Sequence, residues 1–235
     1  MHTTLYSIFA GIAMAIAGIA YLSPEDPIIG SLLFSSGLII TYSFDWYLFT
    51  GKACYVAYHP PKYLKFVSHV LVINILTASA FGYLMRNTKL IHTLVPKAVI
   101  LVESKLSNSL LSGFLLAFGC GILMYVAVIG HRRADDDFGK YILLIIPVVI
   151  YSTAGFEHVI ADSFYFSFAN AWTVDSFIYL CIVALGNLTG CSLIPYCEKL
   201  DIHRNEFHEF QEFDDIAFEE DSVTDFSKNI SEDVT

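Results

Sequence analysis

Two residues of this chain could carry proton chemistry inside a hydrophobic segment. Residues 155–158 read Gly-Phe-Glu-His, and apolar runs flank them at residues 141–151 and 159–168. Ionisable side chains such as Glu157 and His158 are costly within hydrocarbon, so there they usually mark a substrate path or a proton relay. Histidine is the side chain whose unperturbed pKa lies nearest physiological pH. The tetrad therefore predicts a transport path with a titratable centre.

A second interruption lies in the first half of the chain, where residues 45–51 read Asp-Trp-Tyr-Leu-Phe-Thr-Gly. Two broken helices, one in each half, are a pointer to a transport site. Non-helical backbone at membrane depth survives only where it is buried in protein or lines a cavity.

The polar residues of these two interruptions also have a purely structural interpretation. His158 would then be a satisfied core histidine, Glu157 a structural partner of Lys105, and Thr50 a helix cap.

The composition indicates a membrane protein. Hydrophobic residues make up 55% of the 235 residues and mean hydropathy is +0.59, whereas soluble domains are about 45–50% apolar. Six apolar runs are long enough to cross roughly 30 Å of hydrocarbon, at about residues 3–22, 28–58, 65–85, 106–130, 140–168 and 174–197. The first run has no positive leading region and no clear cleavage site, which favours a membrane helix over a signal peptide.

We therefore predict an all-α membrane protein of six transmembrane helices, two of them broken. Its channel domain covers residues 1–200, with inverted halves at about 1–85 and 105–198. Residues 201–235 hold twelve acids and two bases, so the whole net charge of −10 belongs to this tail. Acidic residues with spaced phenylalanines are typical of a disordered tail. Binding a cytoplasmic partner or plugging the pore are the alternatives.

Basic residues predict the orientation. With six spans, one side of the membrane carries Lys62, Lys65, Arg132, Arg133, Lys140, Lys199 and Arg204, and the other carries Arg86, Lys89, Lys97 and Lys105. The positive-inside rule then places both termini in the cytoplasm of a multi-pass protein of the cell membrane. Asp135, Asp136 and Asp137 could suggest a cation site, but a helix-initiating turn before the fifth span is the favoured interpretation.

Several chemistries have no support in the sequence. The five cysteines form no CxxC pair and show no metal-ligand spacing, so they are read as small buried hydrophobes. There is no nucleotide-binding loop and no Ser/His/Asp arrangement. We expect no cofactor, no enzymatic activity, no nucleic-acid partner and no coupling to ATP. Small anions, protons and membrane lipids are the expected partners.

Four segments resemble one known family. Residues 154–161 read Ala-Gly-Phe-Glu-His-Val-Ile-Ala and are similar to the GFEHSIA signature of the formate–nitrite transporter family. Residues 48–50 resemble the LFT of that family's first broken helix, and residues 186–190 resemble the GNIIGG of its sixth span. Residues 120–128, with Lys105 fifteen residues before Cys120, are similar to its fourth span and lysine. The resemblance covers about residues 5–198.

The resemblance implies a homopentamer in which each protomer has its own aquaporin-like pore for formate, nitrite, hydrosulfide or, in some members, lactate. Thr50 would lie opposite His158. The outer constriction would comprise Phe34, Leu48 and Tyr151, and the inner one Leu38 and Met124. Lys105 and Glu157 would supply charge beside the path, and Asn187 would brace the broken helices.

The chain departs from the family pattern at several positions. Tyr151 stands where phenylalanine is common, and Gly121 and Asp162 each replace an asparagine. The third-span GNxxGA becomes Ile-Asn-Ile-Leu-Thr-Ala at residues 73–78, so its helix packing is expected to differ.

Elementary electrostatics favours passage of the anion together with a proton. A bare anion entering an apolar constriction faces an idealised cost of order 20 kcal/mol, lowered to several by relaxation and water. A protonated acid avoids most of it. Burial favours neutral His158, whereas an arriving anion favours the charged form. The hypothesis is proton-linked passage of a weak-acid anion attracted by Lys105. Whether His158 donates its proton or only a hydrogen bond is left open.

Two other functions compete with this hypothesis. A membrane haem oxidoreductase would use His69 and His158 as axial ligands, but no second paired histidine accompanies them. A neutral-solute channel of the aquaporin or urea type would have NPA-like or uncharged pore motifs, which the sequence lacks.

Overall fold

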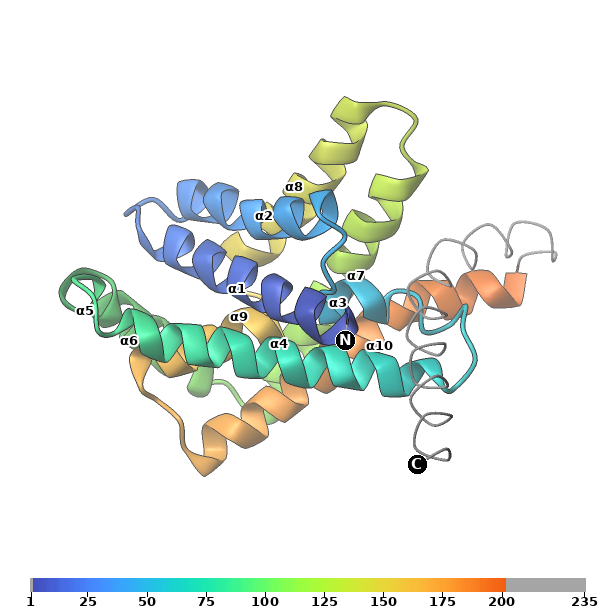
Figure 1. Cartoon of the computed structure of the whole chain (residues 1–235). Coiled ribbons are helices and arrows are strands. Elements are labelled where there is room, and N and C mark those ends of the chain that lie inside the picture. Colours follow the sequence, from blue (N-terminus) through green and yellow to red (C-terminus); the bar gives the residue numbers. More distant parts are fainter. Residues whose placement is uncertain (1, 202–235) are drawn as a thin grey trace, which may run out of the picture.

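The computed structural model describes residues 2–201, and every regular element in that range is a helix (Figure 1). In chain order the helices are α1 (His2–Leu22), α2 (Pro27–Ser43), α3 (Phe49–Ala53), α4 (Tyr63–Met85), α5 (Leu90–Thr93), α6 (Val95–Leu106), α7 (Leu110–Arg133), α8 (Asp137–Thr153), α9 (Val159–Ala169) and α10 (Val174–Asp201). The predicted acidic tail lies outside the described residues, apart from Asp201 at the end of α10.

Four helices, α1, α4, α7 and α10, are long and apolar enough to cross a membrane alone. The other two predicted spans are each made of two helices, α2 with α3 and α8 with α9. The six apolar runs of the sequence thus correspond to these six units. Many large apolar side chains are exposed on the outside, including Leu76, Ile100, Leu111 and Leu115, as a protein surrounded by lipid requires. The predicted all-helical membrane fold is confirmed.

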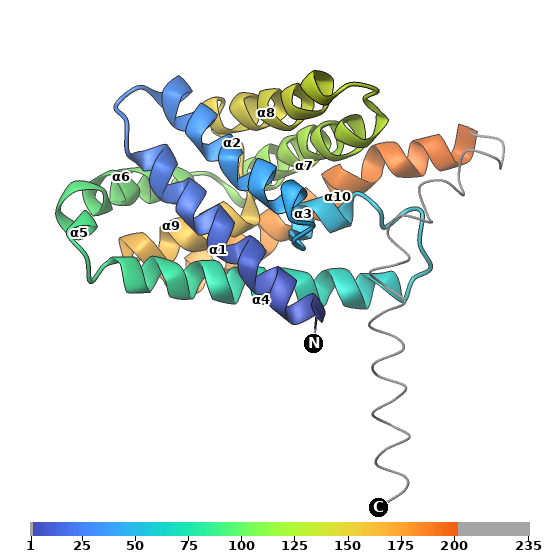
Figure 2. The ribbon, with the colours of Figure 1, turned by 45° about the horizontal axis from the view of Figure 1, so that its top comes forward.

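The two halves of the chain repeat the same helix pairings. In the first half α1 packs against α2 and α4, and in the second half α7 packs against α8 and α10. Each short helix packs against a long helix of the other half: α9 packs against α4, and α3 packs against α10. The two long parts of the broken spans, α2 and α8, lie side by side (Figure 2). Three spans per half make the second half cross the membrane in the opposite sense, as an inverted repeat requires.

Close approach of α7 and α10 explains one departure from the family pattern. A Cβ atom on Gly121 would lie 2.5 Å from the carbonyl oxygen of Asn187 and 2.7 Å from the backbone nitrogen of Cys191. Both are backbone atoms, which cannot move aside cheaply. The backbone contact here admits glycine and leaves no room for a larger residue such as asparagine.

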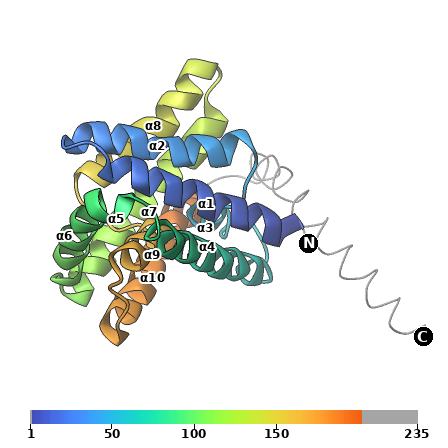
Figure 3. The same ribbon diagram turned by 60° about the vertical axis from the view of Figure 1, so that its left-hand side comes forward.

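The connection between α4 and α7 is folded onto the body of the protein. Its helix α6 packs against α9, and α5 precedes it at the same end of the molecule (Figure 3). Arg86 Nη1 donates a hydrogen bond to the Phe168 carbonyl oxygen (2.6 Å), and Lys97 Nζ lies 2.8 Å from a carboxylate oxygen of Glu25. Helix α6 thereby delivers Lys105, which lies in its last turn, to the buried interior.

Aspartates start two of the helices. Asp26 precedes Pro27 at the start of α2, and its carboxylate accepts hydrogen bonds from two backbone N–H groups of the first turn. Asp136 Oδ1 accepts a hydrogen bond from the Gly139 N–H (2.8 Å) at the start of α8. The helix-initiating interpretation of residues 135–137 is therefore confirmed, since a capping carboxylate satisfies free N–H groups there.

Candidate functional site: a histidine between two broken helices

The two helix breaks have the same backbone course. Residues 44–48 separate α2 from α3, and residues 154–158 separate α8 from α9. Each break contains one residue with a positive φ, Asp45 at 52° and Gly155 at 75°. Only glycine, asparagine and aspartate adopt this region readily, which accounts for both residue types. The sequence thus builds the same turn twice, once in each half.

One asparagine from a neighbouring helix holds the second break. The Val159 N–H at the start of α9 donates to Asn187 Oδ1 (2.9 Å). Asn187 Nδ2 in turn donates to the carbonyl oxygens of Glu157 and Ala117, both at 2.9 Å. Two backbone groups of the break that lack helical partners, the Val159 N–H and the Glu157 carbonyl, are thereby satisfied inside the protein, and the bond to Ala117 ties the break to α7. These contacts support the bracing role predicted for Asn187.

A second asparagine does the same for the first break. The Phe49 N–H donates to Asn74 Oδ1 (2.8 Å), and Asn74 Nδ2 donates to the carbonyl oxygens of Tyr47 (3.0 Å) and Ser7 (2.7 Å). The sequence-based prediction named Asn187 alone. The signal for Asn74 was available, because residues 73–78 keep the family's asparagine while losing its glycines.

His158 lies at the N-terminus of α9, where the chain re-enters helix. Its Nδ1 accepts a hydrogen bond from the Ala161 N–H (3.3 Å), and its Nε2 lies 3.0 Å from Thr50 Oγ1 on α3. The side chain is buried. Because Nδ1 is the acceptor of this N–H, the neutral imidazole carries its proton on Nε2 and donates it to the Thr50 hydroxyl. The predicted pairing of Thr50 with His158 is present in the structure.

The equivalent position of the first break is Leu48. It begins α3 with no side-chain hydrogen bond, and leucine is a poor residue at a helix start. The symmetric turn thus presents an apolar side chain at one break and an imidazole at the other. His158 is the polar member of this pair.

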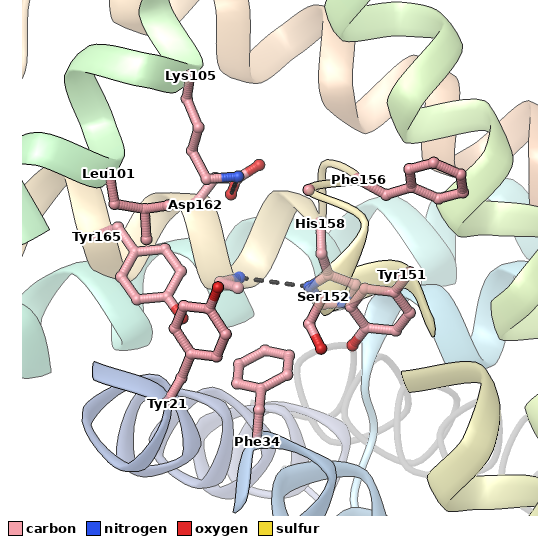
Figure 4. A pocket seen from close by; sticks show the side chains of 12 residues that line it. Tyr21, Phe34, Leu101, Lys105, Tyr151, Ser152, Phe156, His158, Asp162 and Tyr165 are labelled. Atoms are coloured by element: carbon pink, nitrogen blue, oxygen red, sulfur yellow. Dashed lines mark hydrogen bonds and ion pairs between the residues drawn. The ribbon is translucent and has the colours of Figure 1, made fainter. Parts of the chain in front are cut away.

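A small cavity of about 50 Å³ lies beside His158 (Figure 4). One side of it is aromatic, with consecutive ring contacts at centroid distances of 5.9 to 6.2 Å. This aromatic wall runs in order through Tyr165, Tyr21, Phe34, Tyr151 and His158. The last two rings are stacked, with an interplanar angle of 9°.

The opposite side of the cavity carries a buried charge cluster. Lys105 Nζ lies 2.5 Å from Glu157 Oε2 and 2.9 Å from Asp162 Oδ1. Lys105 comes from the last turn of α6, Glu157 from the second break, and Asp162 from the first turn of α9. The predicted Lys105–Glu157 pair is therefore one part of a triad. Of the described residues that line the cavity, Lys105 is the single fixed cation.

Several predicted pore residues are buried but do not line this cavity. Leu38, Leu48 and Met124 belong to the apolar core, so their constriction roles stay predictions. His69 is exposed on α4, where its Nε2 lies 3.1 Å from Thr4 Oγ1. Sequence reasoning missed the aromatic Tyr21 and Tyr165, which carry no local signal.

The geometry defines a class of protein. It is a helical membrane protein with two symmetric broken helices, and its buried His158 lies between Thr50 on α3 and a cavity with an aromatic side. Comparison with known sequences gives the family. The sequence model of the formate/nitrite transporter family matches residues 1–197. The chain belongs to this family, and the resemblance drawn from the four motifs is confirmed.

Individual relatives are distant. The chain is 26% identical over 165 residues to the formate-nitrite transporter of Plasmodium knowlesi (strain H), covering 64% of this chain and 52% of that protein. It is 28% identical over 153 residues to the formate channel BtFdhC of Bacillus thuringiensis, covering 60% and 58%. The chain thus spans little more than half the length of these two relatives.

Solved structures share the fold. A pentameric formate channel with formate bound superposes with a TM-score of 0.69 at 24% identity, covering 82% of this chain and 93% of that one. An FNT family ion channel superposes with a TM-score of 0.70 at 14% identity, covering 86% and 88%. These likenesses establish the arrangement of helices.

If the path beside His158 carries a small anion such as formate, replacing Thr50 with valine is expected to lower its uptake about tenfold without unfolding the protein. Valine has nearly the same shape, but it leaves the Nε2–H of His158 without a partner, at a cost of about 1–3 kcal/mol. Uptake by proteoliposomes measures the effect. Thr41→Val is the matched control, because Thr41 is also buried and its hydroxyl donates to the Leu38 carbonyl oxygen one turn back. Equal uptake by the two variants would remove Thr50 from the path.

Proposed function

We propose that this protein is a channel or transporter for small monovalent weak-acid anions, with formate, nitrite and hydrosulfide as the candidates, and that passage is linked to protons through His158. Family membership supports the substrate class. The observation that carries the proposal is His158 itself, buried at the start of α9, with Nε2 beside Thr50 Oγ1 and its ring stacked on Tyr151. A neutral-solute path would need no titratable group at this depth.

The cavity has features suited to a weak-acid anion. Lys105 lines it, and its ammonium can attract an anion, most strongly where water is scarce, only while the two carboxylates beside it do not both carry a negative charge. The rings of Phe34 and Tyr151 meet edge to face at 6.2 Å, and such an apolar passage penalises a bare ion by several kcal/mol. Attraction by a cation followed by an apolar passage favours an anion that can become neutral by taking up a proton.

The hydrogen bonds of His158 indicate how a proton would pass. In the neutral ring Nε2 holds the proton, and losing it would leave an unfavourable imidazolate. A proton arriving at Nδ1 displaces the Ala161 N–H, whose 3.3 Å contact is long. The resulting imidazolium can release its Nε2 proton to the anion and return to a neutral ring. An adjacent anion favours the charged intermediate.

We further infer a homopentamer in the cell membrane with both termini cytoplasmic. One of the structural neighbours is a pentameric formate channel, and this likeness supports the same assembly here. Exposed apolar side chains such as Leu111 and Phe177 would meet lipid or neighbouring protomers. The orientation follows from the basic residues at one end of the spans.

Flux measurements on proteoliposomes test the function. Purified protein is reconstituted, and uptake of formate, nitrite, hydrosulfide, acetate and lactate is compared with glycerol at two pH values, with protein-free liposomes as the blank. The proposal predicts uptake of one or more of the first three anions, faster at the lower external pH, and no uptake of glycerol. Rapid glycerol entry with no anion uptake would instead identify a neutral-solute channel.

A further inference from the structure

The triad of Lys105, Glu157 and Asp162 contains two carboxylates and one ammonium. The two carboxylate side chains are each 1% exposed, and that of Lys105 is 10% exposed. With every group ionised the cluster would carry a net charge of −1 beside a cavity that is proposed to admit anions. Two carboxylates sharing one buried site do not both ionise readily, because their repulsion adds to the cost of leaving water. One proton on the carboxylate pair would therefore make the triad neutral.

The contacts indicate which oxygen holds this proton. Glu157 Oε2 and Asp162 Oδ1 both accept from Lys105 Nζ. Asp162 Oδ2 is buried and has no hydrogen-bond partner among the described residues. Asp162 also lines the cavity, whereas Glu157 does not. Figure 4 shows the Lys105 amine at the Asp162 carboxyl group, above the aromatic wall.

We propose that Glu157 and Asp162 share one proton, held on Asp162 Oδ2, and that this O–H is a hydrogen-bond donor to the anion in the cavity. This inference rests on the proposed function for the identity of the anion. It makes Asp162 a binding residue at a position where the family pattern in the sequence analysis suggested an asparagine. A neutral carboxyl group and an amide side chain both offer a hydrogen-bond donor and add no charge. Aspartate at position 162 can therefore act like asparagine only while its carboxyl group is protonated.

Other ionisable groups around Asp162 leave this balance unchanged. Besides Lys105 and Glu157 of the triad itself, they are His158 at the second break, Tyr151 on α8, Tyr165 on α9, Tyr179 on α10, Cys120 on α7 and Tyr21 on α1. The phenols and the thiol are neutral at pH 7. Of these described groups, Lys105 is the single permanent cation, so a second carboxylate has no second counter-ion.

Infrared spectroscopy of the reconstituted wild type tests the shared proton directly. A protonated carboxyl group has a C=O stretching band that an ionised carboxylate lacks. We expect this band in the wild type and its loss in Asp162→Asn and in Glu157→Gln, because either change leaves one carboxylate for one ammonium. The control Asp175→Asn, at an exposed position in the first turn of α10, should keep the band. A wild type without the band, or a band unchanged in Asp162→Asn, would overturn the proposal.

Formate uptake by the same samples tests the donor. Asp162→Asn keeps an N–H donor, so its uptake should exceed that of Asp162→Ala by about tenfold, the effect of one buried hydrogen bond. The ratio of Asp162→Asn uptake to wild-type uptake should rise with pH, since the amide cannot acquire a negative charge. Added formate should shift the wild-type infrared band.

The outcomes separate the two proposals. If wild-type liposomes take up no anion while the carboxyl band is present and lost in Asp162→Asn, the transport function fails and the shared proton stands. If anion uptake is robust but Asp162→Ala matches Asp162→Asn at every pH, the donor role fails and the transport function stands. An ionised Asp162 with a purely structural role would move neither the band nor the pH profile.

Discussion

Replacing His158 with asparagine is expected to lower formate uptake by about two orders of magnitude and to flatten its dependence on pH. General acid–base catalysis by a positioned side chain is worth about 10²–10⁴-fold in rate, and this is the contribution that asparagine cannot make. Asparagine is a favoured residue at a helix start, so its side-chain oxygen can still accept from the Ala161 N–H. The protein should therefore fold, and uptake should show the loss of the titratable group.

The control for this variant lies at a different histidine. His69 is exposed on α4 and bonds to Thr4, so His69→Asn removes a titratable ring without touching the path. We expect its uptake to match the wild type. If His158→Asn also kept full, pH-dependent uptake, the imidazole would be no more than a helix cap, and the proton relay would be excluded.

Replacing Asn187 with alanine is expected to destabilise the protein by at least about 3 kcal/mol. The variant removes three buried hydrogen bonds and leaves the N–H of Val159 and the carbonyl of Glu157 without their partner, each at about 1–3 kcal/mol. The apparent melting temperature in detergent should fall by roughly 10 °C. Uptake should also be lost, because the Glu157–His158 turn is no longer held.

The first helix break has an equivalent asparagine, so the same loss of stability is predicted there. Asn74→Ala removes the equivalent three bonds at the first break and should destabilise the protein to a similar extent. Asn87→Ala is the control, since Asn87 is exposed and its amide makes only long contacts of 3.3 and 3.4 Å to its own turn. A melting temperature for Asn187→Ala equal to that of Asn87→Ala would show that the break does not depend on this brace.

Much of the fold was readable from the sequence because membrane helices follow from simple rules. Runs of apolar residues predict spans, and the charged interruptions at residues 45–51 and 155–158 predicted both breaks. The pairing of Thr50 with His158 and of Lys105 with Glu157 came from the family resemblance, which aligns residues that lie far apart in the chain. The hydrogen bonds confirm that both pairs are in contact.

What escaped prediction depends on three-dimensional neighbours. Tyr21 and Tyr165 are ordinary aromatics in apolar helices, and nothing local reveals that they meet across the cavity at 6.2 Å. Asp162 did carry a signal, since it is an ionisable residue inside an apolar run. Its importance emerged only when Lys105 was seen to contact both carboxylates. Gly121 likewise needed the backbone of α10 to explain it.

The central claim is that an anion crosses together with a proton, and an electroneutrality measurement tests it most directly. Proteoliposomes containing a pH-sensitive dye and a voltage-sensitive dye are given an inward formate gradient, with protein-free liposomes as the blank. With proton-linked passage, protein-dependent formate entry should acidify the lumen in proportion to uptake and build no membrane potential. Formate entry that charges the membrane and leaves the lumenal pH unchanged would contradict proton-linked passage through His158.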